Sequence, residues 1–173
     1  MRTLFAAPCL ILGVAVSVAA SALAQMPTYT KAGPLPPALA TATSVFVSNA
    51  GSESILFPEC FSGDPDRPYT EFFSALKSSD RFTLAPGPAQ ADLVLELQLT
   101  ARTSVSPFLE TQPLAMFRLV VYEGKSHYVL WAVTHSIEFG FLQKARDKNF
   151  DAALADVLTQ FLQISSKTPA PAL

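Results

Sequence analysis

The chain has 173 residues, of which 50% are hydrophobic and 15% charged, and it carries a formal net charge of −2. This mildly acidic balance, without a cluster of Lys or Arg, argues against nucleic acid or an anionic membrane surface as the main partner. The stretch between its two Pro-rich ends suits one compact domain and is too short for two domains with cores of their own.

The start of the chain has the pattern of a secretory signal peptide. In residues 1–24, Arg2 gives a positive start, an apolar run follows, and the small-x-small sequence ALA ends at Ala24. We predict cleavage after Ala24 and hence a periplasmic or secreted protein, with a retained membrane anchor as the alternative. Cleavage removes Arg2 and Cys9 and leaves Cys60 as the remaining cysteine, so the mature protein cannot form an internal disulfide.

The remainder of the chain divides into three parts by composition. Residues 25–42 are rich in Pro, Ala and Thr and lack a periodic apolar pattern, which predicts a flexible linker. Residues 167–173 repeat this composition and are predicted to be a disordered tail. Residues 43–166 lie between them and form the single predicted domain, whose stability must come from a hydrophobic core.

The first half of this domain predicts a strand, a helix and a brief second strand. Residues 43–49 (TSVFVSN) form a β-rich run that ends at a turn. After a long loop rich in Gly, Pro and Asp, Pro68 suits the first turn of a helix. The helix carries one apolar stripe, made of Tyr69, Phe72, Phe73 and Leu76. It ends near Asp80, and residues 81–87 (RFTLAPG) give the second strand.

Residues 91–100 (ADLVLELQLT) have the period of two that is typical of a half-buried strand. Four leucines share one face: Leu93, Leu95, Leu97 and Leu99. Each buried leucine contributes roughly 1.5–3 kcal/mol, so together they outweigh anything Glu96 contributes from the other face. We interpret Glu96 as a solvated residue and Asp92, at the strand entry, as a turn or capping residue.

The second half predicts a hairpin and a closing helix. Two β-rich runs, residues 114–123 and 127–139, flank a short Gly-bearing connection. Asn149 is the predicted N-cap of the helix, and Asp151 adds negative charge to its first turn. The helical stripe comprises Phe150, Leu154, Val157, Phe161 and Ile164. This element order predicts an α+β two-layer sandwich, with a mostly antiparallel sheet of four to five strands and two helices on one face.

Metal and cofactor sites are not predicted. The chain contains no G-x-S-x-G, H-E-x-x-H, C-x-x-C, Walker or G-x-G-x-x-G motif. His127 and His135 lie on one predicted strand, roughly 26 Å apart at about 3.3 Å per residue, and cannot share a metal ion. Asp64 and Asp66 invite a calcium site, but the loop lacks the other oxygen ligands of an EF-hand, so a role at the helix entry is favoured.

Cys60 is the remaining enzymatic candidate, because it is an unpaired cysteine in a loop rich in Asp, Pro and Gly. A nucleophilic cysteine needs an imidazole within reach, and only the fold can bring His127 or His135 to it. The other interpretation is a small buried hydrophobic residue. We predict no catalytic residue, and a thiol-dependent secreted enzyme centred on Cys60 stays the alternative.

Several segments together resemble small bacterial cell-envelope proteins. The segments are VFVSN (45–49), YTEFFSALKSSDRFTL (69–84), AQADLVLELQLT (89–100), YVLW (128–131) and RDKNFD (146–151). The pattern is similar to lipoprotein-associated domains of unknown function, to lipopolysaccharide-assembly lipoproteins and to the domain that precedes the Tol-system propeller. The resemblance covers about residues 43–166 and implies a non-catalytic scaffolding or assembly role in the periplasm. The chain departs from the lipoprotein members because it has no usable lipobox cysteine.

These observations predict a binding or assembly factor that engages an envelope protein through its exposed sheet face or an edge strand. Aromatic residues of the long loops, such as Phe57, Phe61 and Phe108, are candidate anchors. Membrane contact is expected only through the signal peptide before cleavage. Besides the thiol enzyme, a small-ligand carrier with a cavity between helices and sheet remains an alternative.

Overall fold

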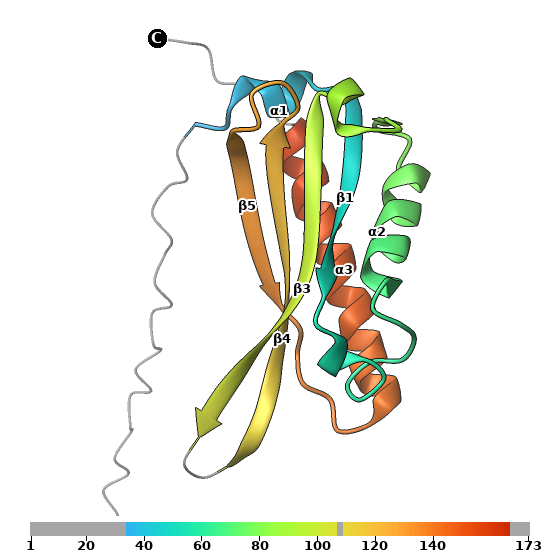
Figure 1. Cartoon of the computed structure of the whole chain (residues 1–173), viewed down its shortest axis with the longest axis vertical. Helices are drawn as coiled ribbons and strands as arrows, with labels where there is room; N and C mark the ends of the chain where they lie inside the picture. Colours follow the sequence, from blue (N-terminus) through green and yellow to red (C-terminus); the bar gives the residue numbers. More distant parts are fainter. Residues whose placement is uncertain (1–33, 107–108, 167–173) are drawn as a thin grey trace, which may run out of the picture. The chain divides into compact units, whose positions relative to one another are not determined.

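The computed structural model describes residues 34–106 and 109–166, with the side chains in these ranges other than those of 103–113. In chain order the elements are α1 (Pro37–Thr41), β1 (Ser44–Ser52), η1 (Ser54–Leu56), α2 (Arg67–Ser78), β2 (Thr83–Leu84), η2 (Pro88–Gln90), β3 (Leu93–Ser106), β4 (Leu109–Glu123), β5 (Val129–Ser136) and α3 (Gln143–Ser166). A five-stranded sheet forms one layer, and α2 and α3 form the other (Figure 1). The predicted α+β fold is confirmed.

The sheet is mixed, with strand order β2-β1-β3-β4-β5. The long ladders are antiparallel and join β3 to β4 and β4 to β5, as the predicted hairpin requires. In contrast, β1 runs parallel to both of its neighbours, β2 and β3. The expectation of a mostly antiparallel sheet missed this parallel side. The cause is the crossover through α2, which returns the chain to the same end of the sheet before β2 and β3 begin.

The core lies between the sheet and the helices, and the alternation predicted for β3 is confirmed. The most deeply buried side chains of β3 and β4 on this face, each at most 2% exposed, are Leu93, Leu95, Leu97, Leu99, Phe117, Leu119 and Val121. Phe117 meets Phe150 of α3 edge-on, with the ring centroids 5.0 Å apart. Glu96 lies on the opposite face and is half-buried, as the strand period requires.

The helix α2 presents the predicted stripe to this core. Phe72 and Leu76 are fully buried, while Tyr69 and Phe73 pack against the core and remain partly exposed. Pro68 occupies the first turn, where its missing N–H costs no hydrogen bond. The apolar spacing read from the sequence therefore gives the correct face of this helix.

The folded domain begins earlier than predicted. The linker expected over residues 25–42 overlaps α1, because Leu39 is fully buried and Ala42 is almost fully buried in the core. Two Pro residues before Ala38 suit the start of this short helix. The predicted signal peptide, the first part of the linker and the predicted tail lie outside the described residues.

The closing helix also begins earlier than predicted. The helix α3 starts at Gln143, so Asn149 lies within it and is not its N-cap. The Asn149 side-chain amide instead donates a hydrogen bond of 3.1 Å to the carbonyl of Glu138. The predicted stripe is correct, because Phe150, Val157 and their partners along α3 are buried. Asn149 directly precedes the apolar stripe of α3, but the helix itself begins six residues earlier, at Gln143.

β3 and β4 continue beyond the rest of the sheet. β1 pairs with β3 only as far as Leu99, and β5 pairs with β4 only from Met116 onward. The pairing of β3 with β4 reaches the Ser106–Leu109 pair. The segments 101–106 and 109–114 thus form a two-stranded arm that projects at the lower end of the domain in Figure 1. Within the described part of the chain, neither outer edge of this arm has a partner strand.

Candidate functional site

The outer edge of β5 is a long free strand edge. β5 is the last strand of the sheet, and no strand of the described residues pairs with its outer side. Its eight residues, VLWAVTHS, include no Lys, Glu, Asp or Pro, which are the residues that usually protect a sheet edge from further pairing. The opposite edge is β2, which has two residues and is followed by Pro86 and Pro88. Of the two outermost strands of the described sheet, β5 is therefore the one whose edge is long enough to accept another strand.

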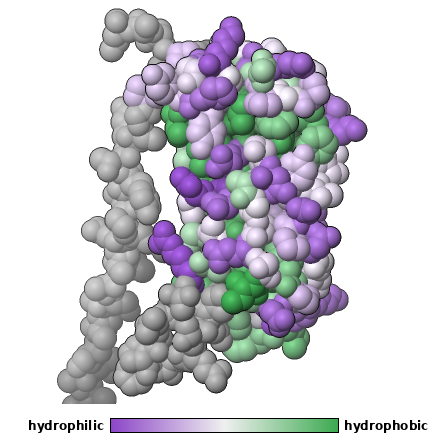
Figure 2. Space-filling model, viewed as in Figure 1, coloured by the Kyte–Doolittle hydropathy of each residue, from purple (hydrophilic) through white to green (hydrophobic). Residues whose placement is uncertain are grey.

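The sheet face that turns away from the helices is covered by no described helix and is mixed in polarity, although Val120 on this face is only 2% exposed. The register places Glu96, Val120 and Ala132 in one row across β3, β4 and β5. Tyr122 hydrogen-bonds to Glu96, and partial burial together with this carboxylate raises the pKa of Tyr122 above its ordinary value. Figure 2 shows hydrophilic and hydrophobic side chains interspersed on the viewed surface. Glu96 thus belongs to a surface polar cluster.

Exposed apolar side chains gather where the arm leaves the domain. We call Leu114, Phe139, Phe141 and Leu142 the end patch; they are 47%, 49%, 89% and 73% exposed. The rings of Phe139 and Phe141 pack edge-on, with centroids 5.3 Å apart. Leu114 and Phe139 line a small apolar cavity of about 50 Å³ together with Ile137. Clustered apolar exposure of this kind is typical of an interaction surface.

The loop that carries the end patch is held in place by hydrogen bonds. The Arg146 guanidinium donates to the carbonyl oxygens of Cys60, at 2.7 Å, and Phe141, at 3.1 Å, and also bonds to the Gln143 side chain. Gly140 fits closely against the first turn of α3, because a Cβ at this position would lie 2.9 Å from the backbone nitrogen of Arg146. The two phenylalanines are thus presented by an ordered loop.

A separate charged cluster joins α2, α3 and the loop between β1 and α2. Arg67 contacts the carboxylates of Glu71, Asp147 and Asp151 at 2.7, 3.0 and 2.6 Å. Its guanidinium also lies 4.3 Å from the centre of the Phe150 ring. Partial burial lowers the pKa of Arg67, but the carboxylates outweigh this and raise it overall. Every acid here pairs with the same cation, so the cluster is a structural link.

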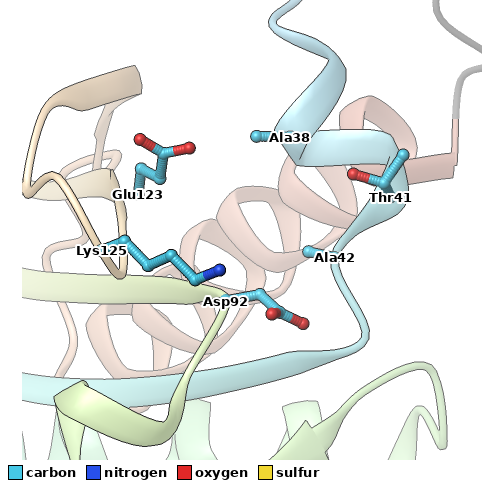
Figure 3. Close-up of a pocket in the computed structure, with 6 residues that line it drawn as sticks. All are labelled: Ala38, Thr41, Ala42, Asp92, Glu123 and Lys125. Atoms are coloured by element: carbon cyan, nitrogen blue, oxygen red, sulfur yellow. The ribbon is translucent and has the colours of Figure 1, made fainter.

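Asp92 is a structural residue at the start of β1. Its Oδ2 accepts hydrogen bonds from the backbone N–H of Thr43 and Ser44, at 2.9 and 3.0 Å, and from the Thr43 hydroxyl. The two backbone donors first, and then the hydroxyls, lower the pKa of Asp92 to about 2. Asp92, Glu123 and Lys125 line a polar hollow of about 160 Å³. Figure 3 shows Asp92 below Lys125 and Glu123. The predicted capping role is supported.

The two histidines lie at opposite ends of β5. His127 precedes the strand and has a positive φ of 57°, so the prediction that both lie on one strand is wrong for this residue. The Nε2 atom of His135 lies 3.6 Å from the Asp156 carboxylate, beside a polar hollow of about 200 Å³. Ser136 lines the same hollow, but no hydrogen bond between described atoms joins it to His135.

Cys60 is half-buried beside the apolar cavity under the end patch. Its backbone carbonyl accepts hydrogen bonds from Arg146 and Gln143. No histidine is among the described residues that line this cavity. The surroundings are apolar on one side and are occupied by structural hydrogen bonds on the other. Cys60 therefore has the environment of a packing residue.

The aspartates of the loop before α2 form hydrogen bonds with groups of the protein itself. The Asp64 carboxylate accepts a hydrogen bond of 2.9 Å from the Asp66 N–H, and Asp66 accepts one from the Asn49 amide. Asp66 stands directly before α2, as predicted, although its side chain makes no capping bond to the helix. Among the described residues, no group of three or more His, Cys, Asp and Glu side chains is placed to hold a metal ion.

The candidate aromatic anchors are corrected by the structure. Phe57 and Phe61 are buried, because α3 packs over their loop and Phe61 meets Phe150 with ring centroids 5.1 Å apart. Phe108 lies outside the described residues. Among the described phenylalanines, the exposed ones are instead Phe139 and Phe141, at and beyond the end of the strand predicted over residues 127–139. Their signal in the sequence is the pattern F-G-F-L, where Gly140 interrupts strand periodicity between two aromatic residues.

Comparisons with known proteins place the fold and leave the family open. No protein-family model and no curated protein matches the chain. A DUF4136 family protein from Bacteroides thetaiotaomicron aligns over 78% of this chain and 96% of its own, with a TM-score of 0.52 and 12% identity. This protein shares the fold. A DUF330 family protein from Xanthomonas campestris covers 77% and 89% of the two chains, at 12% identity and a TM-score of 0.46.

A third structure is the lipoprotein GNA1162 from Neisseria meningitidis, which covers 70% of this chain and 98% of its own, at 14% identity and a TM-score of 0.41. The structural neighbours are thus bacterial domains of unknown function and bacterial lipoproteins. The narrower resemblance to lipopolysaccharide-assembly lipoproteins and to the Tol-system domain finds no support in these three structures. Among the described helices, none is long and apolar enough to cross a membrane.

Proposed function

We propose that this chain is an exported, non-catalytic protein of the bacterial envelope that binds an extended segment of an envelope partner along β5. Export is supported by the signal-peptide pattern of residues 1–24. The envelope assignment is supported by the resemblance of residues 43–166 to small cell-envelope domains. A sheet that adds a strand from its partner gains backbone hydrogen bonds along the whole contact.

The observation that carries this proposal is the unprotected outer edge of β5. Its eight residues leave a row of backbone N–H and C=O groups without a partner strand in the described ranges. Exposed strand edges are normally shortened, charged or covered, because they attract other strands. β2, at the other edge, follows that rule, and β5 does not. An edge kept open in this way is well suited to a partner strand.

The edge is a better binding surface than the open sheet face, which was the second possibility. That face carries the Glu96–Tyr122 hydrogen bond and the charged side chain of Arg118 beside it. Docking a partner there would remove water from these polar groups, which costs free energy unless each gains a new hydrogen bond. Strand addition at β5 leaves the face solvated and uses only backbone groups that already point outward.

The alternatives of an enzyme and a ligand carrier have less support. Cys60 shares its cavity with no histidine among the described lining residues, and the cavity measures only about 50 Å³. Small-molecule sites usually measure roughly 300–1,000 Å³. The apolar hollow between α2 and α3 reaches about 270 Å³, but it opens at the surface and lies outside the space between helices and sheet. Partner binding accounts for the unprotected outer edge of β5, which an enzyme or a ligand carrier would leave unexplained.

Site-specific photocrosslinking in cells tests this proposal. A photoreactive residue replaces Thr134 on the edge strand, its cross-strand neighbour Arg118 on the same face of β4, or Thr159 on the outer surface of α3. We expect one defined envelope protein to be captured from the Thr134 position and not from the other two. The adduct should also be lost when the second change Ala132→Lys places a charge on the edge.

Two results would contradict the edge as the binding surface. One is equal capture from Arg118 and Thr134, which would favour the sheet face. The other is an adduct that survives Ala132→Lys in a protein whose circular dichroism is unchanged. Slow thiol labelling of Cys60 that appears only on unfolding would separately remove the thiol-enzyme alternative, whereas rapid labelling of the native protein would revive it.

A further inference from the structure

We propose that the end patch is a self-association surface, against which a second copy of this chain packs its own end patch about a two-fold axis. The patch comprises Leu114, Phe139, Phe141 and Leu142 and lies beyond the end of β5, so this interface is separate from the outer edge of that strand. The inference goes beyond the proposed function and does not depend on it. It follows from three properties of this end of the domain.

The first property is the amount of apolar surface in one place. Phe141 and Leu142, in the loop between β5 and α3, are 89% and 73% exposed. Phe139 packs on Phe141 and also lines the apolar cavity beside Leu114. Aromatic residues with a limited number of rotamers supply large contact areas at low entropic cost. Such a group is suited to the centre of an interface and poorly suited to water.

The second property is preorganisation. The Phe141 carbonyl accepts a hydrogen bond from Arg146, whose guanidinium also binds the Cys60 carbonyl. Leu142 begins the helix hydrogen bonding, because its carbonyl accepts from the Ala145 and Arg146 N–H groups. The apolar side chains therefore project from a fixed backbone. An ordered surface of this kind loses little conformational entropy on binding.

The third property is the charge around the patch. Glu138 and Lys144 are both exposed, and neither has an ion-pair partner among the described side chains. Arg102, the exposed cross-strand neighbour of Leu114, adds a second cation. A surface that carries charges of both signs beside an apolar centre can meet a copy of itself rotated by 180° so that opposite charges approach each other. In that arrangement Glu138 of one copy approaches Lys144 of the other. A surface of one sign would instead repel its copy.

The arm is a further argument for a second copy of the chain at the end patch. A two-stranded ribbon is marginally stable by itself in water, and the segments 101–106 and 109–114 have free outer edges on both sides. Leu114 joins this arm to the end patch. A second copy at this end covers the patch and lies beside the arm, where the arm gains a neighbour. A membrane surface as occupant is disfavoured because Glu138 lies at the rim of the patch.

The test is the molar mass of the exported protein as a function of concentration, measured by sedimentation equilibrium. We expect a monomer–dimer equilibrium. The double substitution Phe141→Ser/Leu142→Ser should raise the dimer dissociation constant by at least about 30-fold, as loss of two central apolar anchors does. Tyr128→Ser is the matched control, since Tyr128 is 75% exposed at the other end of β5 and should leave the equilibrium unchanged.

A charge reversal provides an independent variant that leaves the apolar residues intact. Glu138→Lys should weaken the dimer by about tenfold because it brings like charges together, and Glu138→Lys/Lys144→Glu should restore it. The inference is overturned if the protein stays monomeric up to about 1 mM, the weak end of specific association. It is equally overturned if assembly persists in folded Phe141→Ser/Leu142→Ser protein, if larger oligomers form, or if the monomer instead binds vesicles through this patch.

Discussion

Replacing Asp92 by Asn tests whether this carboxylate fastens β1 to β3. The Asp92 Oδ2 accepts hydrogen bonds from the Thr43 and Ser44 N–H groups and from the Thr43 hydroxyl. In return, the Asp92 N–H donates to the Ser44 carbonyl and hydroxyl. Asparagine keeps the size of the side chain and one carbonyl acceptor. The substitution therefore removes the negative charge and leaves the packing unchanged.

The size of the effect follows from the pKa. Lowering the pKa of Asp92 from 3.8 to about 2 corresponds to about 2.4 kcal/mol at about 1.36 kcal/mol per pKa unit. The carboxylate is exposed, so solvent screens it and roughly half of this value should be measurable. We therefore expect Asp92→Asn to reduce the free energy of unfolding by about 1 kcal/mol at neutral pH, consistent with the loss of a charged capping residue.

The same shift fixes the pH dependence. A carboxylate whose pKa is lower in the folded protein stabilises it fully above the unfolded value of 3.8, and this stabilisation is lost as pH falls toward 2. Urea unfolding of the two proteins should thus give a difference that is constant from pH 7 to about pH 5 and shrinks between about pH 4 and pH 2. Asp80→Asn, at an exposed position with positive φ, is the matched control and should change little.

The reasoning about Asp92 is wrong if Asp92→Asn unfolds within about 0.3 kcal/mol of the parent protein at pH 7, since a charged capping bond is worth more than that. It is also wrong if the difference stays the same down to pH 2. The first result would mean that the three hydrogen bonds exchange freely with water. The second would mean that the loss comes from packing and not from the charge.

Three further changes probe the rest of the fold by urea unfolding. Arg67→Met should lower the free energy of unfolding by about 2–4 kcal/mol, because it leaves three carboxylates without their shared cation. The control Lys77→Ala, on the exposed face of α2, should lower it by less than about 0.5 kcal/mol. Equal losses in the two variants would contradict a structural role for the cluster. Phe117→Ala should cost about 3–5 kcal/mol through the cavity beside Phe150, and a loss below about 1 kcal/mol would place the core elsewhere. Gly124→Ala should cost about 1–3 kcal/mol, because its Cβ would lie 1.9 Å from a backbone oxygen, and an unchanged midpoint would refute this close packing.

The features that the sequence predicted well are local. The alternation in Leu93–Thr100 specifies a strand with one buried face, and the structure buries all four leucines there. The stripe of α2 and the stripe of α3 are correct for the same reason, since each is set by spacing within one element. The capping role of Asp92 could be predicted because a carboxylate at the start of a strand usually accepts hydrogen bonds from nearby backbone N–H groups.

The features that failed depend on contacts between distant segments. Nothing in residues 43–49 shows that β1 is parallel to β3, because parallel pairing results from where α2 returns the chain. Phe57 and Phe61 look like loop anchors until α3 covers them. The true start of α3 was hidden because the six residues before Asn149 carry no apolar stripe. The Arg146 side chain anchors this first part of the helix by donating hydrogen bonds to the carbonyl oxygens of Cys60 and Gly140.

The end patch was missed for a related reason. Phe139 continues the period of β5 in the sequence, so its exposure became visible only once the strand was seen to end at Ser136. The open edge of β5 was foreseen only as one of two surfaces, because strand order cannot be derived from the pattern of a single strand. Its lack of charge is visible in the sequence, but its position at the edge comes from the structure.

Hydrogen exchange of the backbone amides of β5, compared between the free protein and its crosslinked partner complex, tests strand addition most directly. If a partner strand pairs with Val129–Ser136, amides that point outward should exchange slowly in the complex and rapidly in the free protein. Amides of β1, including Ser48, should be unchanged. Protection confined to the open sheet face or to the helices, with β5 exchanging as in the free protein, would contradict the account.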